Sequence, residues 1–337
     1  MRLVTYLPPD APQDGTSFDL DAHGRAAGLL QVFGEEVLVD LERAGRVVGR
    51  TLPRRLLDLV AAGPAAWDTA RSVLDQATEG DLPSGYGSDE HTLPAELVRL
   101  LAPIPTPPMV RDFYAYEDHV RRGFAKRGAD IPPEWFELPA FYKQNHRAIR
   151  GPEEELPWPA FTDELDYELE IAMVVGVGGR DIPESRAGEH VFGYTIMNDV
   201  SARDLQRTEM AVRLGPAKSK DFATVLGPVL VTADELDPLD LHPVARIDGE
   251  VVTDSRTSDM RWTFEQMLAY VSIDEDVFPG DVFGSGTVAN GCGLEHGRML
   301  RPGEVLELEV PGIGILRNRV GVPRPKVDLP RPRDGLA

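Results

Sequence analysis

The segment from Leu165 to Ala172 constrains the fold most, because in it apolar residues alternate with three carboxylates. Side chains of a β-strand alternate between the two faces of a sheet, so Asp166, Glu168 and Glu170 would project to one side. Like charges at this spacing repel one another unless their face meets bulk water or a bound cation. The segment therefore predicts a β-strand whose carboxylate face is either solvated or a set of metal ligands.

Short apolar runs separated by turns recur through the chain, which has 337 residues, 32 of them Gly and 29 Pro. Many short strands predict a mainly β, α+β fold of the barrel or roll kind rather than alternating βα units. Prolines between Pro103 and Pro108 cannot continue a helix and mark a boundary. The expected parts are a small mixed α/β domain at 1–105, a β-rich catalytic domain at 106–325 and a tail at 326–337.

Two further expectations are local. A last helix of the N-terminal domain is expected from Pro94 to Leu101, just before the proline cluster. Residues Asp199 to Gln206 are expected to form a polar turn after an apolar strand.

Composition excludes several classes of partner. The formal net charge of −21 argues against nucleic acid and anionic membranes, because both are bound by basic surfaces. Cys292 is the one cysteine, so no intrachain disulfide can form, and the chain suits a reducing compartment. The start of the sequence lacks the apolar run of a signal peptide, and no run of 18 apolar residues occurs. We expect a cytoplasmic protein with a small-molecule substrate.

A second carboxylate signal follows the first. Asp199 ends an apolar run, and the end of a strand is where a side chain can point into the mouth of a pocket. Carboxylates from separate strands can converge on a hard divalent cation, which prefers oxygen ligands. Zinc is disfavoured because the sequence has no HExxH motif and no cluster of Cys and His.

Several separated motifs, in their order, resemble the fumarylacetoacetate hydrolase family. The resemblance runs from Arg111 to about Val320. It comprises Glu168-Leu169-Glu170, the segment Asn198 to Gln206, the looser segment Ser219 to Thr224, Asp112-Phe113-Tyr114 with His119 after it, and Gly286-Thr287. A chance match to a single motif would not give this order.

The resemblance implies a divalent-metal site. Its ligands would be Glu168, Glu170, Asp199 and, as in the longer members of the family, Asp112; alternatively Asp112 caps the turn after its strand. The ion would be Mg²⁺, or Ca²⁺ or Mn²⁺ in its place.

The resemblance also implies the acid–base residues. His119 would be the general base that activates water. Arg122 stands where many members have the glutamate that partners this histidine, so Glu295 is a candidate replacement. Lys220 would support the metal site and a developing enolate, unless it is simply a solvated lysine. The segment from Val120 to Leu138 would be a lid that carries His119 into place.

The substrate contacts implied by the resemblance come from five residues. These are Tyr114, Tyr142, Arg203, Gln206 and Thr287. Arg203 could instead pair with Asp204 or Asp199 for structure alone. The family also implies a homodimer.

The implied reaction is metal-dependent cleavage of a C–C bond in a 1,3-dicarbonyl or acylpyruvate-type 2-oxo acid, through an enolate. The same enolate chemistry serves decarboxylases, hydratases and isomerases of 2-oxo acids. Val200, where fumarylacetoacetate hydrolases proper often have tryptophan, weakens the case for that particular substrate. An alternative of another class is a non-catalytic, metal-stabilised binding protein, which would have no need of His119, Lys220 and Arg203.

Overall fold

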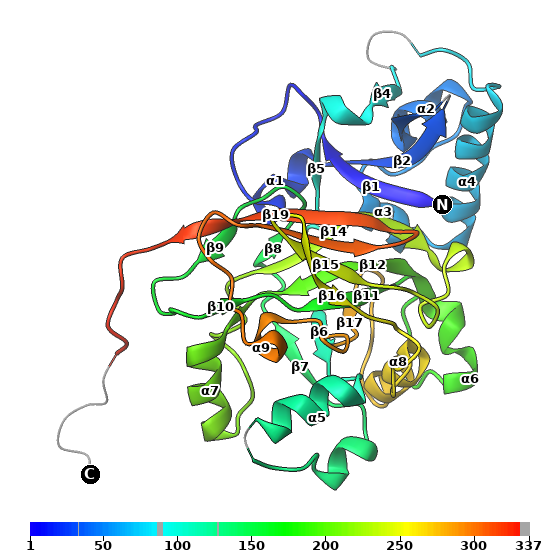
Figure 1. Ribbon diagram of the computed structural model, residues 1–337. Helices are drawn as coiled ribbons and strands as arrows, with labels where there is room; N and C mark the ends of the chain where they lie inside the picture. Colours follow the sequence, from blue (N-terminus) through cyan, green and yellow to red (C-terminus); the bar gives the residue numbers. More distant parts are fainter. Residues whose placement is uncertain (33, 86–89, 127, 331–337) are drawn as a thin grey trace.

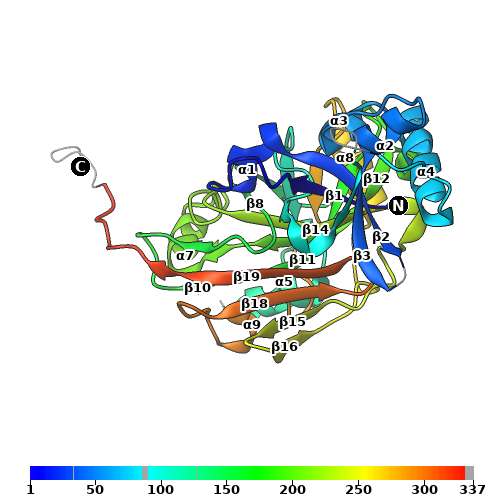
Figure 2. The same cartoon turned by 90° about the horizontal axis from the view of Figure 1, so that it is seen from above.

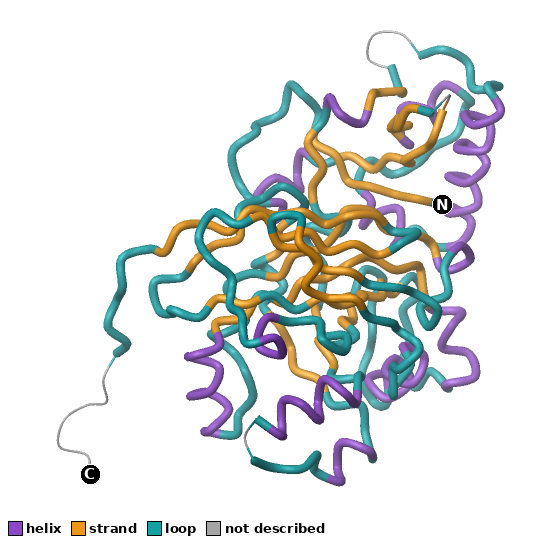
Figure 3. The backbone as a smooth tube through the Cα atoms, viewed as in Figure 1, coloured by secondary structure: helices purple, strands orange, loops and turns teal. Residues whose placement is uncertain are grey.

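The computed structural model describes residues 1–32, 34–85, 90–126 and 128–330. Strands fill the centre of the molecule and the helices lie around them (Figures 1 and 3). The mainly β, α+β prediction is confirmed, although within the described residues the strand orders are open and no barrel closes.

The larger sheet has 12 strands, ten of them on one path with β5 beside β1 and β8 beside β14. Its members along the path, followed by the two side strands, are β4 (Thr92–Pro94), β3 (Glu35–Asp40), β2 (Arg25–Val32), β1 (Arg2–Leu7), β14 (Thr224–Thr232), β12 (Val191–Asp199), β11 (Leu169–Val175), β17 (Val282–Gly284), β6 (Val110–Phe113), β7 (Phe141–Gln144), β5 (Arg99–Leu101) and β8 (Ile149–Arg150).

A second sheet has five strands and runs along one side of the molecule in the turned view (Figure 2). Its order is β16 (Glu250–Asp254), β15 (Val244–Ile247), β18 (Val305–Val310), β19 (Gly314–Pro323) and β9 (Leu156–Trp158). A two-stranded ribbon joins β10 (Leu165–Asp166) to β13 (Ser201–Ala202).

The helices are mostly short. The α-helices are α1 (Ser17–Leu20), α2 (Leu41–Val47), α3 (Leu56–Ala61), α4 (Pro64–Glu79), α5 (Glu117–Ala125), α6 (Glu184–Ala187), α7 (Arg203–Val212), α8 (Phe264–Ser272) and α9 (Gly293–His296). The 3₁₀ turns are η1 (Asp21–His23), η3 (Ala95–Leu97), η4 (Pro133–Phe136), η5 (Gly188–His190) and η6 (Ala233–Glu235).

The centre of the larger sheet is buried on both faces. Every residue of β11 and of β12 is buried, which fits their nearly continuous apolar sequences. One face packs against the five-stranded sheet, and the other packs against α2, α3 and α4 of the N-terminal segment. The carboxylates that these strands carry are therefore held inside the protein, on its most constrained elements.

Two local expectations were wrong. Residues Pro94 to Leu101 form no α-helix, because β5 pairs with β1 through Leu101 and Thr5, and η3 precedes it. In place of the expected turn after Asp199, Ser201 and Ala202 form β13, and α7 begins at Arg203.

The predicted domain boundary near residue 105 stays a prediction, although β1 pairs with β14 and so joins the two parts in one sheet. The predicted tail at 326–337 lies partly outside the described residues. No helix in the described ranges is both long and apolar enough to cross a membrane. The expected cytoplasmic location also stays a prediction.

Candidate active site

Three carboxylates converge where neighbouring strands of the larger sheet meet. Asp112 lies on β6, Glu170 on β11 and Asp199 at the end of β12, and one oxygen of each lies within 4.8 Å of the others. We call these three residues the carboxylate cluster. Strand β17 separates β6 from β11, and its Gly284 leaves the space that the cluster needs. A Cβ at Gly284 would stand 2.7 Å from Asp112 Oδ1 and 2.8 Å from Glu170 Oε2.

The carboxylate cluster holds more negative charge than its neighbours offset. All three side chains are buried. Burial raises the pKa of Glu170, and the nearby Asp112 and Asp199 raise it further. Burial also raises the pKa of Asp199 and of Asp112. Such shifts express the free-energy cost of placing several ionised carboxylates together away from water.

Two oxygens of the carboxylate cluster have no hydrogen-bond donor among the described residues. They are Asp112 Oδ1 and Asp199 Oδ1, and both are buried. Buried polar atoms are nearly always paired, so these oxygens need a partner that the protein does not supply. An all-oxygen set with surplus negative charge fits a hard divalent cation such as Mg²⁺, Mn²⁺ or Ca²⁺.

Glu168 is not a member of the carboxylate cluster and pairs with two basic side chains instead. Its Oε1 lies 2.7 Å from Arg203 Nη2, and its Oε2 accepts a hydrogen bond of 2.6 Å from Lys220 Nζ. Although burial opposes the charged form, Arg203 and Lys220 hold the pKa of Glu168 below its ordinary value. The role of Glu168 as a metal ligand stays a prediction.

Lys220 connects Glu168 to the carboxylate cluster. Its Nζ also donates to Asp199 Oδ2, and the residue is 2 % exposed. Although burial opposes the charge, Asp199 and Glu168 raise the pKa of Lys220, so it stays an ammonium ion. The solvated-lysine alternative is therefore wrong.

Asp166 is the residue whose importance the sequence hid. The predicted strand from Leu165 to Ala172 is divided in the structure into β10 and β11, and Asp166 ends β10. Asp166 is fully buried, so the solvated-face alternative is wrong for this segment. Its Oδ2 accepts hydrogen bonds from Arg203 Nε at 2.8 Å and from the Leu294 amide at 2.9 Å, and its Oδ1 accepts one from the Gly293 amide at 2.8 Å. The carboxylate pattern itself was the available signal, because it placed Asp166 on the same strand face as Glu168.

Arg203 therefore has partners that the sequence analysis did not consider. It pairs with Asp166 and Glu168 rather than with Asp204 or Asp199. Asp204 instead accepts hydrogen bonds from Thr162 and from nearby amides.

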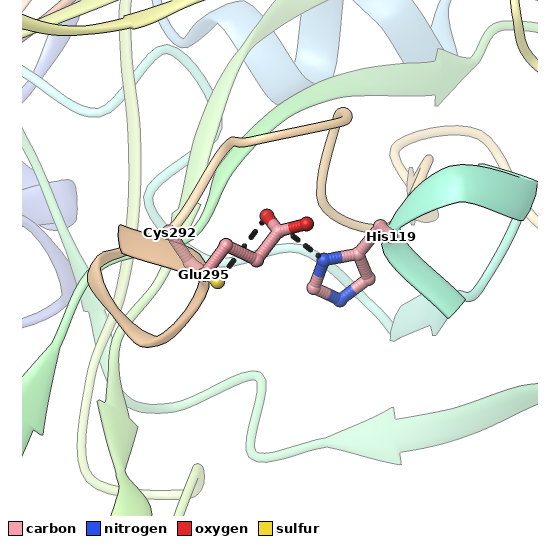
Figure 4. Close-up of side chains that lie close together, drawn as sticks. All are labelled: His119, Cys292 and Glu295. Carbon is pink, nitrogen blue, oxygen red and sulfur yellow. Dashed lines mark hydrogen bonds and ion pairs between the residues drawn. The ribbon is translucent and has the colours of Figure 1, made fainter. Parts of the chain in front are cut away.

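His119 and Glu295 come together from distant parts of the sequence. His119, on α5, is 8 % exposed, and its Nδ1 lies 3.2 Å from Glu295 Oε2 (Figure 4). Although burial opposes the charged carboxylate, contact with His119 lowers the pKa of Glu295. The structure thus places next to each other the two residues predicted to act as base and partner.

The turn that carries Glu295 is anchored beside the carboxylates. The backbone of Cys292, just before α9, forms an isolated bridge with Glu168. Asp166 holds the amides of Gly293 and Leu294, as described above. A Cβ at Gly293 would stand 2.0 Å from the Arg298 carbonyl oxygen and 2.5 Å from Asp166 Oδ1, so this turn admits no side chain there.

The structure places four of the five predicted substrate contacts against site residues. The Tyr142 hydroxyl donates to Asp199 Oδ2 at 2.6 Å, Gln206 Oε1 accepts from Arg203 Nη1 at 3.0 Å, and Thr287 Oγ1 lies 3.5 Å from Glu170 Oε1. The ring of Tyr114 meets that of His119 edge-on at 5.5 Å. Arg203, the fifth, is occupied by buried carboxylates. Their roles toward a substrate stay predictions.

Comparison with known proteins adds independent information. The family described as Fumarylacetoacetate (FAA) hydrolase C-terminal matches residues 108–321. The chain is 30 % identical to the mitochondrial oxaloacetate tautomerase fahd2 of Xenopus laevis over 95 % of this chain and 90 % of that protein. It is 31 % identical to the oxaloacetate tautomerase YisK of Bacillus subtilis, over 86 % of this chain and 95 % of that protein.

Solved structures share the whole fold. The crystal structure of a 5-carboxymethyl-2-hydroxymuconate delta-isomerase from Mycobacterium smegmatis matches with a TM-score of 0.66 at 26 % identity, covering 95 % of this chain and 99 % of that one.

Proposed function

Because the chain belongs to the fumarylacetoacetate hydrolase family, we propose that it is a divalent-metal-dependent tautomerase of an oxaloacetate-type 2-oxo dicarboxylic acid. The observation that carries the proposal is the His119–Glu295 pair beside a buried cluster of three carboxylates. Two relatives that align over most of the chain and bear the name oxaloacetate tautomerase support it.

The carboxylate cluster would hold the cation. Asp112, Glu170 and Asp199 supply the oxygens, and Lys220 offsets part of their charge. When bound, the cation would polarise the oxygens of a 2-oxo acid and lower the free energy of its enolate. Tyr142 and Thr287 would fix the orientations of Asp199 and Glu170 through the contacts already described.

His119 would move the proton. Its Nδ1 faces Glu295, so Nε2 is the atom left to remove a proton from the carbon next to the ketone. The electron pair of that C–H bond forms the C=C bond, the π pair of the ketone moves onto its oxygen, and Nε2 returns the proton to that oxygen. Glu295 stabilises the imidazolium formed in between, because its carboxylate stays ionised. The reverse sequence converts enol to ketone, and no other reactant is needed.

Hydrolysis of an acylpyruvate is the second candidate. The same 3.2 Å contact between His119 and Glu295 would let Nε2 take a proton from water for attack on the second carbonyl group. The leaving group would be the enolate that the cation stabilises. This is the reaction that the sequence analysis favoured.

A substrate panel separates the two. Chelated protein is resupplied with Mg²⁺, Mn²⁺ or Ca²⁺; enol absorbance and deuterium uptake from solvent report tautomerisation of oxaloacetate, and product analysis reports acylpyruvate cleavage and decarboxylation. Acceleration of keto–enol exchange that is lost in His119→Gln is expected. No acceleration above buffer overturns the proposal, and faster acylpyruvate cleavage establishes the second candidate instead.

The chain contains a matched control for His119. His242 also lies against a carboxylate, with its Nε2 2.5 Å from Asp254 Oδ1, but this pair is exposed. His242→Gln should leave both reactions unchanged. An equal loss in the two variants would mean that the assay does not report on the proposed base.

A further inference from the structure

A second set of metal-ligating atoms lies beside the carboxylate cluster. Cys292 Sγ, His119 Nδ1 and a carboxylate oxygen of Glu295 lie within 4.8 Å of one another (Figure 4). We call these residues the thiol–imidazole–carboxylate group. Cys292 is fully buried, and the Glu295 side chain is only 3 % exposed. The group was invisible in the sequence because Cys292 and His119 are separated by more than half of the chain.

Two buried atoms of this group have no hydrogen bond within the described part of the chain. His119 Nδ1 and Glu295 Oε1 are buried, and neither has a hydrogen bond of normal geometry with any described residue. His119 itself is more than nine-tenths buried, and its Nδ1 points at the carboxylate in Figure 4. Cys292 Sγ donates a weak hydrogen bond of 3.5 Å to Glu295 Oε2, and Arg122 Nε lies 4.0 Å from Glu295 Oε1. Glu295 Oε2 thus lies near both the thiol and the imidazole, while the buried His119 Nδ1 keeps no hydrogen bond within the described residues.

Two of their spacings are compatible with tetrahedral zinc, and the third lies within 4.8 Å. Bonds of about 2.0 Å to nitrogen or oxygen and about 2.3 Å to sulfur put tetrahedral zinc ligands about 3.3 Å (N to O) and about 3.5 Å (S to O) apart. The corresponding distances here are 3.2 Å and 3.5 Å. We propose that the thiol–imidazole–carboxylate group binds Zn²⁺, with its fourth position open to water.

The two sites differ in ligand chemistry. A thiolate and an imidazole select a borderline-soft ion such as Zn²⁺ or Co²⁺, whereas the all-oxygen carboxylate cluster suits Mg²⁺. Excess Mg²⁺ should therefore fill the carboxylate cluster and leave the second site open.

Binding exchanges a proton for the metal. The Cys292 S–H bond breaks, sulfur keeps the electron pair and forms the S–Zn bond, and the proton leaves to solvent. Because this proton is released, the Zn²⁺ affinity should rise with pH.

Occupancy would switch off the base. Zn²⁺ on His119 Nδ1 and on Glu295 would take from the imidazole its carboxylate partner, so the protein would be inhibited by zinc while it needs another divalent ion. This consequence rests on the proposed function, whereas binding itself does not.

Cobalt provides a direct test of binding. Co²⁺ is titrated into the full-length protein in excess Mg²⁺, and the near-ultraviolet thiolate-to-cobalt charge-transfer band is recorded. Because Cys292 is the one cysteine of the sequence, such a band has a single origin. The wild type should show the band and Zn²⁺ should displace it; absence of the band in the wild type overturns the site, without reference to any variant.

Variants then locate the ligands. The band should be lost in His119→Gln, and Zn²⁺ binding measured by calorimetry should weaken at least about tenfold in Cys292→Ser, with Cys292→Ala as a second variant in case the serine form fails to fold. Glu170→Gln and His242→Gln should keep the band. A band that persists in His119→Gln would contradict the assigned geometry.

Activity separates this inference from the proposed function. Each protein is compared with its own zinc-free rate: Zn²⁺ should inhibit the wild type, whereas Cys292→Ser should need at least about tenfold more Zn²⁺ for the same fractional loss. Thiolate-bound cobalt in a protein whose turnover Zn²⁺ does not inhibit would support the metal site and contradict the role of His119 as base. Equal inhibition of the wild type and Cys292→Ser would contradict the site.

Discussion

The carboxylate cluster and the thiol–imidazole–carboxylate group are neighbours built in opposite ways. The first stands on β6, β11 and β12, which belong to one continuous sheet and are buried throughout. The second stands on α5, on α9 and on Cys292 just before α9; these helices have nine and four residues and lie outside that sheet. The comparison shows that the buried sheet holds the carboxylate cluster in position. The position of Glu295, the proposed partner of His119, depends instead on a few hydrogen bonds to the turn before it.

A substitution in the carboxylate cluster should have the largest effect on cation binding and turnover. Glu170→Gln removes one carboxylate from the cluster, so affinity for Mg²⁺ should fall by more than about 100-fold, and turnover should fall with it. Without divalent cation the same variant should unfold at a higher temperature than the wild type, because it relieves repulsion that raises the pKa of Glu170. Thermal unfolding with and without Mg²⁺ measures both.

The exposed Glu79→Gln is the control for this change and should move neither transition. A wild-type Mg²⁺ response in Glu170→Gln would place the cation elsewhere.

A substitution of His119 should lower the reaction rate without lowering the affinity for Mg²⁺. His119→Gln should reduce the rate by about 10²–10⁴-fold, the contribution usual for a general base, while Mg²⁺ affinity stays at the wild-type value. Initial rates at saturating Mg²⁺ and calorimetric titration provide the two numbers. Loss of Mg²⁺ binding in this variant would erase the distinction between the two regions.

A substitution of Asp166 tests whether the turn that carries Glu295 depends on its hydrogen bonds to this carboxylate. Asp166→Asn leaves the buried Arg203 without one of its two carboxylate partners and weakens the anchor of α9. Breaking a buried pair in this way costs about 3–5 kcal/mol of unfolding free energy. Urea denaturation measures this loss, and the pH profile of the remaining activity shows whether His119 has lost its partner. A wild-type unfolding midpoint would mean that the anchor is not needed.

The smallest effect concerns pH. In the folded protein the pKa values of Asp112, Glu170 and Asp199 are raised, so the folded state binds protons more tightly than the unfolded chain. Stability from these groups is present below the ordinary carboxyl range and is lost as pH rises through their raised values. Glu168 has the opposite sign, since its lowered pKa confines its loss to strong acid.

Without divalent cation, the unfolding free energy should therefore fall as pH rises above the ordinary carboxyl range, and saturating Mg²⁺ should flatten the slope. Denaturation curves at a series of pH values measure it. A slope that Mg²⁺ does not change would contradict the assignment of the charge to the cluster.

The sequence predicted the sheet-borne side better than the helix-borne one. Alternation and an apolar strand end indicated that Glu170 and Asp199 lie on strands, because both signals are local, but only the resemblance named them as metal ligands. The contact between His119 and Glu295 could be suggested only by resemblance, since nothing local relates α5 to α9. As the one cysteine of the sequence, Cys292 carries no local signal of a metal site, because His119 and Glu295 come close to it only in the folded chain.

Two other misses have tertiary causes. Residues near Leu101 carry a helix-like apolar pattern, yet they pair with the end of β1 that lies beyond its pairing with β14. The helix α7 was overlooked because Arg203, Asp204 and Gln206 were interpreted as a polar turn. Its first residue is buried against Asp166 and Glu168, which no local propensity expresses.

The anchor of α9 has a consequence for anyone who would redesign this protein. Gly293 has no room for even a methyl group, and Asp166 occupies the space beside it. Libraries aimed at new substrates should therefore keep these two positions constant and randomise the neighbouring exposed residues of α5. In a collection of variants, substitutions at Gly293 and Asp166 should abolish folding or activity, whereas substitutions at the exposed residues of α5 should be tolerated.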